Sequence, residues 1–373
     1  MDLLPNDVVE LILERLDVKS LLKFKSVSKQ WKSTIQCRAF QERQLMNRRQ
    51  SGNPDVLFVS VCDHSYLFDT VFEDMRTLVV GSSVSVKIPT PWAKKRLYNV
   101  CKSSCDGLIC LHDANVPNIV ANPTTRWHRT FPLSTYQRLR YHEDRVSSTP
   151  WANLGFGKDK TNGTFKPVCL YNSAEFGGLY NDDNSTTICE VFDFTTNAWR
   201  YVVPASPYPI LPYQDPIYVD GSLHWLTEGE TANVLSFDLH TETFQVMSKA
   251  PFLHHHHHSN RDLVMCNLDD RLCVSEKMWP KQVIWSFDSD RGTWNEIYSI
   301  DLNITSSWLG KHRFSLTPLG VVDKDKLLFC EPLTGDPLLT LDPKTKSYEI
   351  AHEFLYHTSA LPLCYFQSLI TIL

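Results

Sequence analysis

The sequence predicts a small all-α segment of three helices followed by an all-β, propeller-like domain of about six blades. The first ~45 residues carry apolar side chains at helical spacing, whereas the remainder consists of short β-rich runs separated by Gly, Asp, Asn and Pro. Paired turn signatures also recur through the β-rich part. We therefore expect the helical segment over residues 1–47, a polar linker over 48–55 and the β-domain over 56–373.

The N-terminal segment has the pattern of consecutive amphipathic helices. Apolar residues recur every four positions from Leu4 to Leu16, which marks one face of a helix. Pro5 suits a first helical turn, because the N–H groups of that turn have no intrahelical partner. Asp17 and Ser28 are suitable N-caps for a second and a third helix. Three short helices bury little core, so part of their apolar surface is expected to be an interface, with the β-domain or with a partner.

These residues resemble an F-box, the three-helix motif that binds a Skp-type adaptor in cullin-based ubiquitin ligases. Leu-Pro at 4–5, Leu-Leu at 21–22 and Val-Ser-Lys-x-Trp at 27–31 follow the F-box order without gaps. The resemblance implies a Skp-type adaptor as direct partner and cullin and RING subunits as indirect ones. The positions that match the pattern, and are the candidate adaptor-binding residues, are Leu4, Pro5, Ile12, Leu13, Leu16, Leu21, Leu22, Val27 and Trp31.

Two short signatures alternate along the β-rich part. One is a turn followed by a short apolar strand, as after Asp106 and Asp220. The other places an Asp six residues before an aromatic, as in Asp193 and Trp199, and a shortened copy places Asn122 five residues before Trp127. The Asp or Asn closes a hairpin and the aromatic packs on the return strand. Trp127, Trp199 and Trp294 share this position and are expected in the core.

The spacing of these units favours a propeller. Units begin at positions 106, 159, 220, 269 and 323, so they are 53, 61, 49 and 54 residues apart, which is the period of a four-stranded blade. Residues 56–80 supply a weakly marked further unit. The run from Leu361 to Leu373 reads as a strand and is expected to complete a blade begun near the start of the domain, which removes exposed sheet edges. Two packed β-sandwiches are the alternative architecture.

Several stretches are similar to the plant F-box-associated domain, over most of residues 55–373. They are Ser104–Leu111, the Asn-Pro-Thr-Thr run from Asn122, Gly155–Asp159 and Asp220–Trp225. The resemblance implies a kelch-like propeller that follows an F-box. Pro167 departs from the family pattern, so we expect an edge strand or a bulge there, because proline has no N–H for a ladder.

Composition limits the remaining function classes. Residues 1–50 hold 10 Lys+Arg against 6 Asp+Glu, but the rest holds 27 against 36, which argues against nucleic-acid binding. No apolar run is long enough for a membrane span, no secretion signal is visible, and eleven scattered cysteines fit reduced thiols. We expect a cytoplasmic and/or nuclear protein that contacts neither nucleic acid nor membrane.

No catalytic, metal or cofactor motif stands out, so we expect no enzyme activity and no cofactor. The spacing of Cys101, Cys105 and Cys110 lacks the paired C-x-x-C of structural zinc sites. The run His254–His258 could bind a divalent metal or titrate near neutral pH, but a polar loop is the favoured interpretation.

We therefore expect a non-catalytic substrate receptor that bridges a Skp-type adaptor to an unidentified target protein. The alternative is a carbohydrate- or small-ligand-binding propeller carried on an F-box, in which exposed tryptophans stack on the ligand. Target recognition belongs to loops on a rigid scaffold, here residues 134–153, 173–187, 204–216 and 304–313. Within these loops the residue types that interface hot spots favour are Arg138, Arg140, Tyr141, Tyr208, Tyr213 and Trp308.

Overall fold

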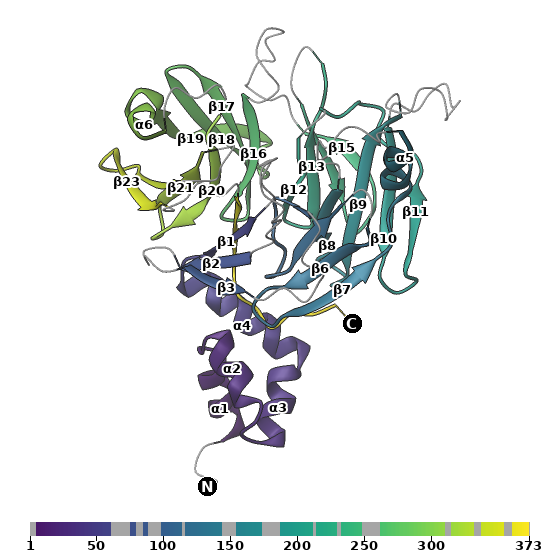
Figure 1. Cartoon of the computed structure of the whole chain (residues 1–373), viewed down its shortest axis with the longest axis vertical. Helices are drawn as coiled ribbons and strands as arrows, with labels where there is room; N and C mark the ends of the chain where they lie inside the picture. The colour runs from purple at the N-terminus through teal and green to yellow at the C-terminus, as the bar shows by residue number, and fades with distance from the viewer. Residues whose placement is uncertain are drawn as a thin grey trace, which may run out of the picture.

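The structure is a computed structural model, and it joins a helical head to a ring of β-sheets (Figure 1). It describes residues 5–60, 75–79, 85–88, 98–113, 116–143, 154–173, 187–211, 214–229, 233–247, 262–309, 315–331, 337–353 and 360–372. The predicted order of an all-α head followed by a β-propeller is confirmed.

The head contains α1 (Asn6–Leu13), α2 (Val18–Phe24), α3 (Lys29–Gln36) and α4 (Arg38–Ser51). The two expected N-caps are confirmed. The Asp17 carboxylate accepts a hydrogen bond from the Ser20 backbone N–H at 3.0 Å, and the Ser28 hydroxyl accepts one from the Trp31 N–H at 3.1 Å. Each cap satisfies a backbone donor that the first turn of its helix leaves without a partner.

Helix α4 is a correction to the expected three helices and to the linker over 48–55. It continues to Ser51, and the first strand begins at Asp55, so only three residues separate the parts. The polar composition of residues 48–51 suggested a linker, but Arg and Gln are good helix formers and these residues continue the helix. Arg49, within the expected linker, is held by ion pairs to Asp106 at 3.3 Å and Asp270 at 3.6 Å.

Among the described residues, the β-part forms six four-stranded antiparallel sheets. Five use consecutive strands, and the sixth joins the first three strands to the last, in the order β24-β1-β2-β3. The strands are β1 (Asp55–Ser60), β2 (Met75–Val79), β3 (Ser85–Ile88), β4 (Asn99–Val100), β5 (Ile109–His112), β6 (Asn118–Asn122), β7 (Trp127–Phe131), β8 (Leu154–Lys158), β9 (Phe165–Asn172), β10 (Thr187–Asp193), β11 (Ala198–Val202), β12 (Ile217–Val219), β13 (Ser222–Leu226), β14 (Val234–Asp238), β15 (Phe244–Val246), β16 (Leu263–Leu268), β17 (Arg271–Met278), β18 (Lys281–Asp288), β19 (Thr293–Asp301), β20 (Thr317–Val322), β21 (Lys326–Cys330), β22 (Leu338–Asp342), β23 (Ser347–His352) and β24 (Ala360–Tyr365); two further helices are α5 (Thr135–Glu143) and α6 (Leu302–Leu309).

The two ends of the β-part pair with each other and close the ring. β24 runs antiparallel to β1, in a register from Asp55↔Tyr365 to Ser60↔Ala360. Every pair of neighbouring sheets around the ring shares a buried apolar cluster, so the sheets enclose a common axis. The expected closure by the C-terminal run is confirmed, although the strand ends at Tyr365 and not at Leu373.

The repeated acids are turn residues, as predicted. The backbone of Asp106, Asp220, Asp269 and Asp323 has positive φ between 47° and 54°, the left-handed conformation that Asp tolerates in tight turns. In the second signature the side-chain oxygen accepts backbone N–H bonds two or three residues ahead. This holds at Asn122, Asp193, Asp238, Asp288 and Asp342.

Pro167 lies in β9, an internal strand of its sheet and not an edge, and the ladder shows no register shift there. The expected edge or bulge is therefore wrong. The β9–β10 ladder stops at Val168, one residue away, so the missing N–H of proline interrupts no bond of that ladder.

The chain segment after β24, residues 366–372, ties the head to the ring. The Asn122 side chain donates to the Ile370 carbonyl oxygen at 2.9 Å, and the Arg38 guanidinium donates to the Thr371 carbonyl oxygen at 3.1 Å. Leu369 is only 2% exposed, because it inserts into the core of the head. The buried residues that surround it are Leu13, Val18, Leu21, Ile35 and Phe40.

Leu369→Ala is expected to destabilise the protein by about 2–4 kcal/mol, because it leaves a cavity in the head core. Urea unfolding followed by the helical circular dichroism signal measures this loss. Leu11→Ala, at a side chain that is 59% exposed, is the matched control and should change stability by less than about 0.5 kcal/mol. Equal effects of both variants would contradict the packing of the tail in the head.

Candidate functional site

The helical head contacts one face of the ring. Arg49 of α4 reaches Asp106 in the turn before β5 and Asp270 in the turn before β17. Asn53 exchanges hydrogen bonds with Asp323 in the turn before β21, at 2.7 and 2.9 Å. These turns join the first and second strands of three sheets. Because strands alternate in direction, the turns between third and fourth strands lie on the same side.

The opposite face carries the connections between second and third strands and those between sheets. We call it the distal face; α5 and α6 lie on it, on the side of the ring away from the head (Figure 1). All four loops expected to bind a target are connections of this kind. Strand alternation therefore separates the candidate target loops from the helical head.

The structure places some of the predicted target residues and leaves others open. Arg138 on α5 is exposed, and Tyr208 is 48% exposed. Arg140 and Tyr141 belong to α5 and Trp308 to α6, but their side chains are not among those described. Tyr213 and the His254–His258 run lie outside the described residues.

Exposed apolar side chains on the distal face were missed by sequence reasoning. Val203, just after β11, is 87% exposed, and Tyr201 beside it is 50% exposed. A second group comes from the β17–β18 turn and α6, where Met278, Trp279 and Ile304 are 52%, 48% and 45% exposed. The sequence feature that could have predicted their exposure is their position in a turn or at the end of an outer strand. By contrast, the three matched tryptophans are half-buried and pack against core clusters.

The head presents a separate apolar face toward solvent. Ile12 and Val27 are 50% and 60% exposed, and Pro5 is also exposed. Val8 and Leu11 are 38% and 59% exposed and extend this face, but they were not among the adaptor-binding residues expected from the sequence. The four-residue spacing of Val8 from Ile12 could have identified Val8. Of the other candidate positions, Leu13 and Leu21 are buried in the head core, and Leu16, Leu22 and Trp31 are half-buried against it. Leu4 lies outside the described residues.

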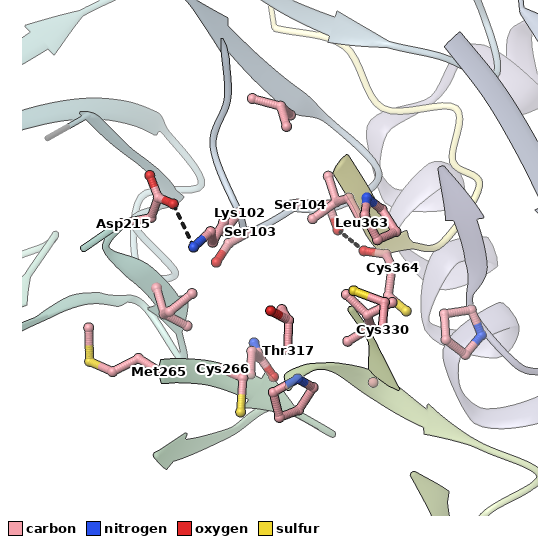
Figure 2. A pocket seen from close by; sticks show the side chains of 18 of the residues that line it. Lys102, Ser103, Ser104, Asp215, Met265, Cys266, Thr317, Cys330, Leu363 and Cys364 are labelled. Carbon is pink, nitrogen blue, oxygen red and sulfur yellow. Dashed lines mark hydrogen bonds and ion pairs between the residues drawn. The ribbon is translucent and has the colours of Figure 1, made fainter. Parts of the chain in front are cut away.

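A cavity of about 560 Å³ occupies the axis of the ring (Figure 2). Its wall comes from the innermost strands β4, β12, β16, β20 and β24, and Arg49 of α4 contributes to it from the head side. Inside, the Lys102 ammonium lies 2.9 Å from the Asp215 carboxylate, and the two side chains are 39% and 15% exposed. The attraction of Asp215 raises the pKa of Lys102, so this ion pair persists at neutral pH.

Several other groups of the lining are uncharged at neutral pH, although the acids Asp269, Asp270 and Glu331 also line the cavity. Burial lowers the pKa of His112 to about 4, which keeps its imidazole uncharged at neutral pH. Burial also raises the pKa of the Cys364 thiol to about 12. The Ser104 hydroxyl donates to the Cys364 carbonyl oxygen at 2.9 Å, and the Ser103 hydroxyl accepts from the Tyr218 N–H at 3.0 Å.

Comparison with known families assigns both parts of the chain. Residues 1–40 match the F-box domain, and residues 59–372 match the F-box associated beta propeller domain. The chain belongs to the family of F-box proteins. It is 72% identical to the F-box protein At2g34280 of Arabidopsis thaliana, with 100% of both chains covered. It is 58% identical to the F-box protein At5g10340 of the same plant, covering 100% of this chain and 85% of the relative. It is also 51% identical to the F-box/LRR-repeat/kelch-repeat protein At1g09650 of Arabidopsis thaliana, covering 100% and 97%.

The F-box implies a Skp-type adaptor as a partner, and its exposed apolar face is the surface available for one. Among the described residues, no cluster of His, Cys, Asp or Glu has the makings of a metal site. Within the same residues, no helix has the length and apolar character needed to cross a membrane.

Among the described residues of the propeller, His112 and His224 are buried histidines and should make it acid-sensitive. Burial lowers both pKa values from 6.5 to about 4, so between these pH values the unfolded chain binds protons that the folded protein does not. Stability therefore falls as the pH drops through this window, by up to about 1.4 kcal/mol per pH unit for each histidine. His112→Gln removes one contribution, so the variant should lose about 2–3 kcal/mol less than wild type between pH 7 and 4.5 in urea titrations. Parallel pH curves would contradict a neutral His112.

Proposed function

We propose that this protein is the substrate-recognition subunit of an SCF-type (Skp–cullin–F-box) E3 ubiquitin ligase. Its F-box binds a Skp-type adaptor, which connects it to the cullin and RING subunits, and its propeller binds a target protein for ubiquitination. The observation that carries this proposal is the separation of two exposed surfaces by the closed ring of sheets. The apolar face of the head lies at one end, and the target loops lie on the distal face at the other.

In the adaptor complex, the proposed anchors are Pro5, Val8, Leu11, Ile12 and Val27. An apolar face of this kind is typical of a protein–protein contact, because water leaves it on binding. The buried positions of the same motif act indirectly by holding the helices in register. Leu4 is proposed to extend the face, from its position in the F-box pattern.

The propeller is proposed to work as a spacer of fixed geometry, with its six sheets as the six kelch-like blades of one ring. Helix α4 and residues 366–372 fasten the head to it through Arg49, Asn53 and Leu369. A rigid connection holds a target lysine near a ubiquitin-loaded enzyme that another subunit carries, which raises the effective concentration of the reacting groups. This chain then needs no catalytic residue, and it acts in the cytoplasm, the nucleus or both.

The target is proposed to bind on the distal face. The candidate residues of the sequence are Arg138, Arg140, Tyr141, Tyr208, Tyr213 and Trp308, and all of them except Tyr213, which lies outside the described residues, belong to its connections. Tyr201, Val203, Met278 and Trp279 join them because exposed aromatic and aliphatic side chains are typical anchors of an interface. Loops vary more readily than the strands that support them, so this face can be fitted to one target without altering the ring.

Ile12→Ala combined with Val27→Ala is expected to weaken adaptor binding by tens- to hundreds-fold, because two exposed anchors are lost. Titration calorimetry with a purified Skp-type adaptor measures the affinity. The matched control is Met278→Ala combined with Trp279→Ala, an equally exposed apolar pair on the distal face, which should bind the adaptor like wild type. Loss of adaptor affinity in the control, or none in the F-box variant, would contradict the proposed adaptor face.

The distal pair should show the converse behaviour toward targets. In a reconstituted ligase, the variant with Met278→Ala and Trp279→Ala should reduce ubiquitin transfer to co-purified targets while the adaptor stays bound.

Cys37 is the one exposed thiol among the described cysteines. Cys37→Ala should leave ubiquitin transfer unchanged, because a receptor forms no thioester. Abolished transfer in a folded, adaptor-bound Cys37→Ala variant would overturn the receptor assignment.

A further inference from the structure

We propose that the axial cavity of the propeller is a binding site for one small amphipathic molecule that is not anionic and that carries a hydrogen-bond donor next to an acceptor. The inference rests on the cavity and its lining, and it stands whether or not the ligase assignment is correct.

The cavity has the size and construction of a small-molecule site. Its volume of about 560 Å³ falls within the ~300–1,000 Å³ that encloses a drug-sized ligand. Most such sites combine an apolar wall with a few fixed polar groups. Here Val100, Ile217, Met265 and Leu363 supply apolar wall, on four different innermost strands. The strands belong to a closed ring, so the site is formed before any ligand arrives.

Figure 2 shows the Lys102–Asp215 ion pair with Ser103 close to Lys102. An ammonium group has three N–H donors, and the contact with Asp215 uses one of them. The carboxylate of Asp215 likewise has further lone pairs. A ligand acceptor can therefore bind Lys102 while a neighbouring donor binds Asp215. Ser103 lies beside the pair, and because its hydroxyl oxygen accepts from Tyr218 N–H, its own proton can be donated.

The charge of the lining disfavours an anionic ligand. Among the described lining residues the cations are Lys102 and Arg49, and each already has carboxylate partners. His112 is neutral, and further acids, Asp269 and Glu331, also line the cavity. An anion would thus add negative charge where no cation is left to compensate it.

The proposal can be tested with three fluorescent probes that share one ring system. 4-Amino-1,8-naphthalimide is neutral and has an imide N–H flanked by carbonyl oxygens. Its N-methyl derivative keeps the acceptors and lacks that donor, and its N-carboxymethyl derivative carries a negative charge. Fluorescence titration of the full chain gives the affinity and stoichiometry of each probe.

The neutral imide should bind one to one. The N-methyl probe should bind about tenfold or more weakly, because a hydrogen bond to a charged carboxylate is lost, and the carboxylate probe should bind more weakly than the imide. The double variant with Lys102→Met and Asp215→Leu should bind the imide and N-methyl probes equally. Equal affinity for the two probes would show that Lys102 and Asp215 contact the ligand. If the pair had only a structural role, the double variant would still distinguish the two probes.

A variant that fills the cavity provides the positional test. Thr317 lines the wall, and Thr317→Phe should reduce binding of the imide at least tenfold, whereas Val203→Ala on the distal face should not. Circular dichroism and melting curves like those of wild type establish that the variants are folded. Unchanged binding in folded Thr317→Phe, tighter binding of the anionic probe, or no binding of the imide at millimolar concentration would overturn the proposal and leave a water-filled channel. Adaptor affinity is measured separately, so such a result leaves the ligase function untouched.

Discussion

The pairing of the chain's two ends is the constraint on which the rest of this structure depends. β24 supplies the innermost strand of the sheet that β1 begins, so no sheet of the ring is left without its first strand. The segment that follows places Leu369 in the head core and the backbone of Ile370 against Asn122 of the ring. One stretch of about a dozen residues therefore closes the propeller and completes the helical head. The stability of the two parts is linked through it, although they are far apart in sequence.

That linkage has a functional consequence. The short joint after α4 would not by itself fix the orientation of the head, because a few residues leave rotational freedom. Arg49 bridges acids in the turns of two different sheets, and Asn53 is bound to a third. These polar contacts are partly exposed and individually weak, so the buried side chain of Leu369 contributes most of the hold. In the proposed ligase, an orientation fixed in this way would let target binding on the distal face determine where the target lies relative to the adaptor.

The sequence predicted what depends on near neighbours. Helix caps at Asp17 and Ser28, and the turn acids Asp193 to Asp342, act on backbone groups within three residues, so their identity and spacing are visible in the chain itself. Strand closure was also predictable, because an apolar C-terminal run must pair somewhere. The contacts of Arg49 and Leu369 were not, since they join residues that are 57 or more positions apart, and no local pattern encodes such a partner. The exposed Val203 and Trp279 were missed for a related reason: an apolar residue beside a strand is ordinarily buried, and only the tertiary fold shows otherwise.

The positions of the turn signatures on the ring explain why target recognition is the property most difficult to predict from the sequence. Turn acids recur because the five sheets built from consecutive strands need the same tight turns, and these turns lie on the face that the head occupies or adjoins. The distal connections face no such requirement, so they can differ in length and residue type from sheet to sheet. Their variety is what a receptor for one target requires, and it also removes the repetition by which a sequence reveals structure. The axial cavity combines regular and irregular positions. Its wall is built from the regular innermost strands, whereas its ion pair, Lys102 and Asp215, comes from positions just outside those strands. A regular scaffold thus supplies the shape of the site, and two irregular positions supply its chemistry.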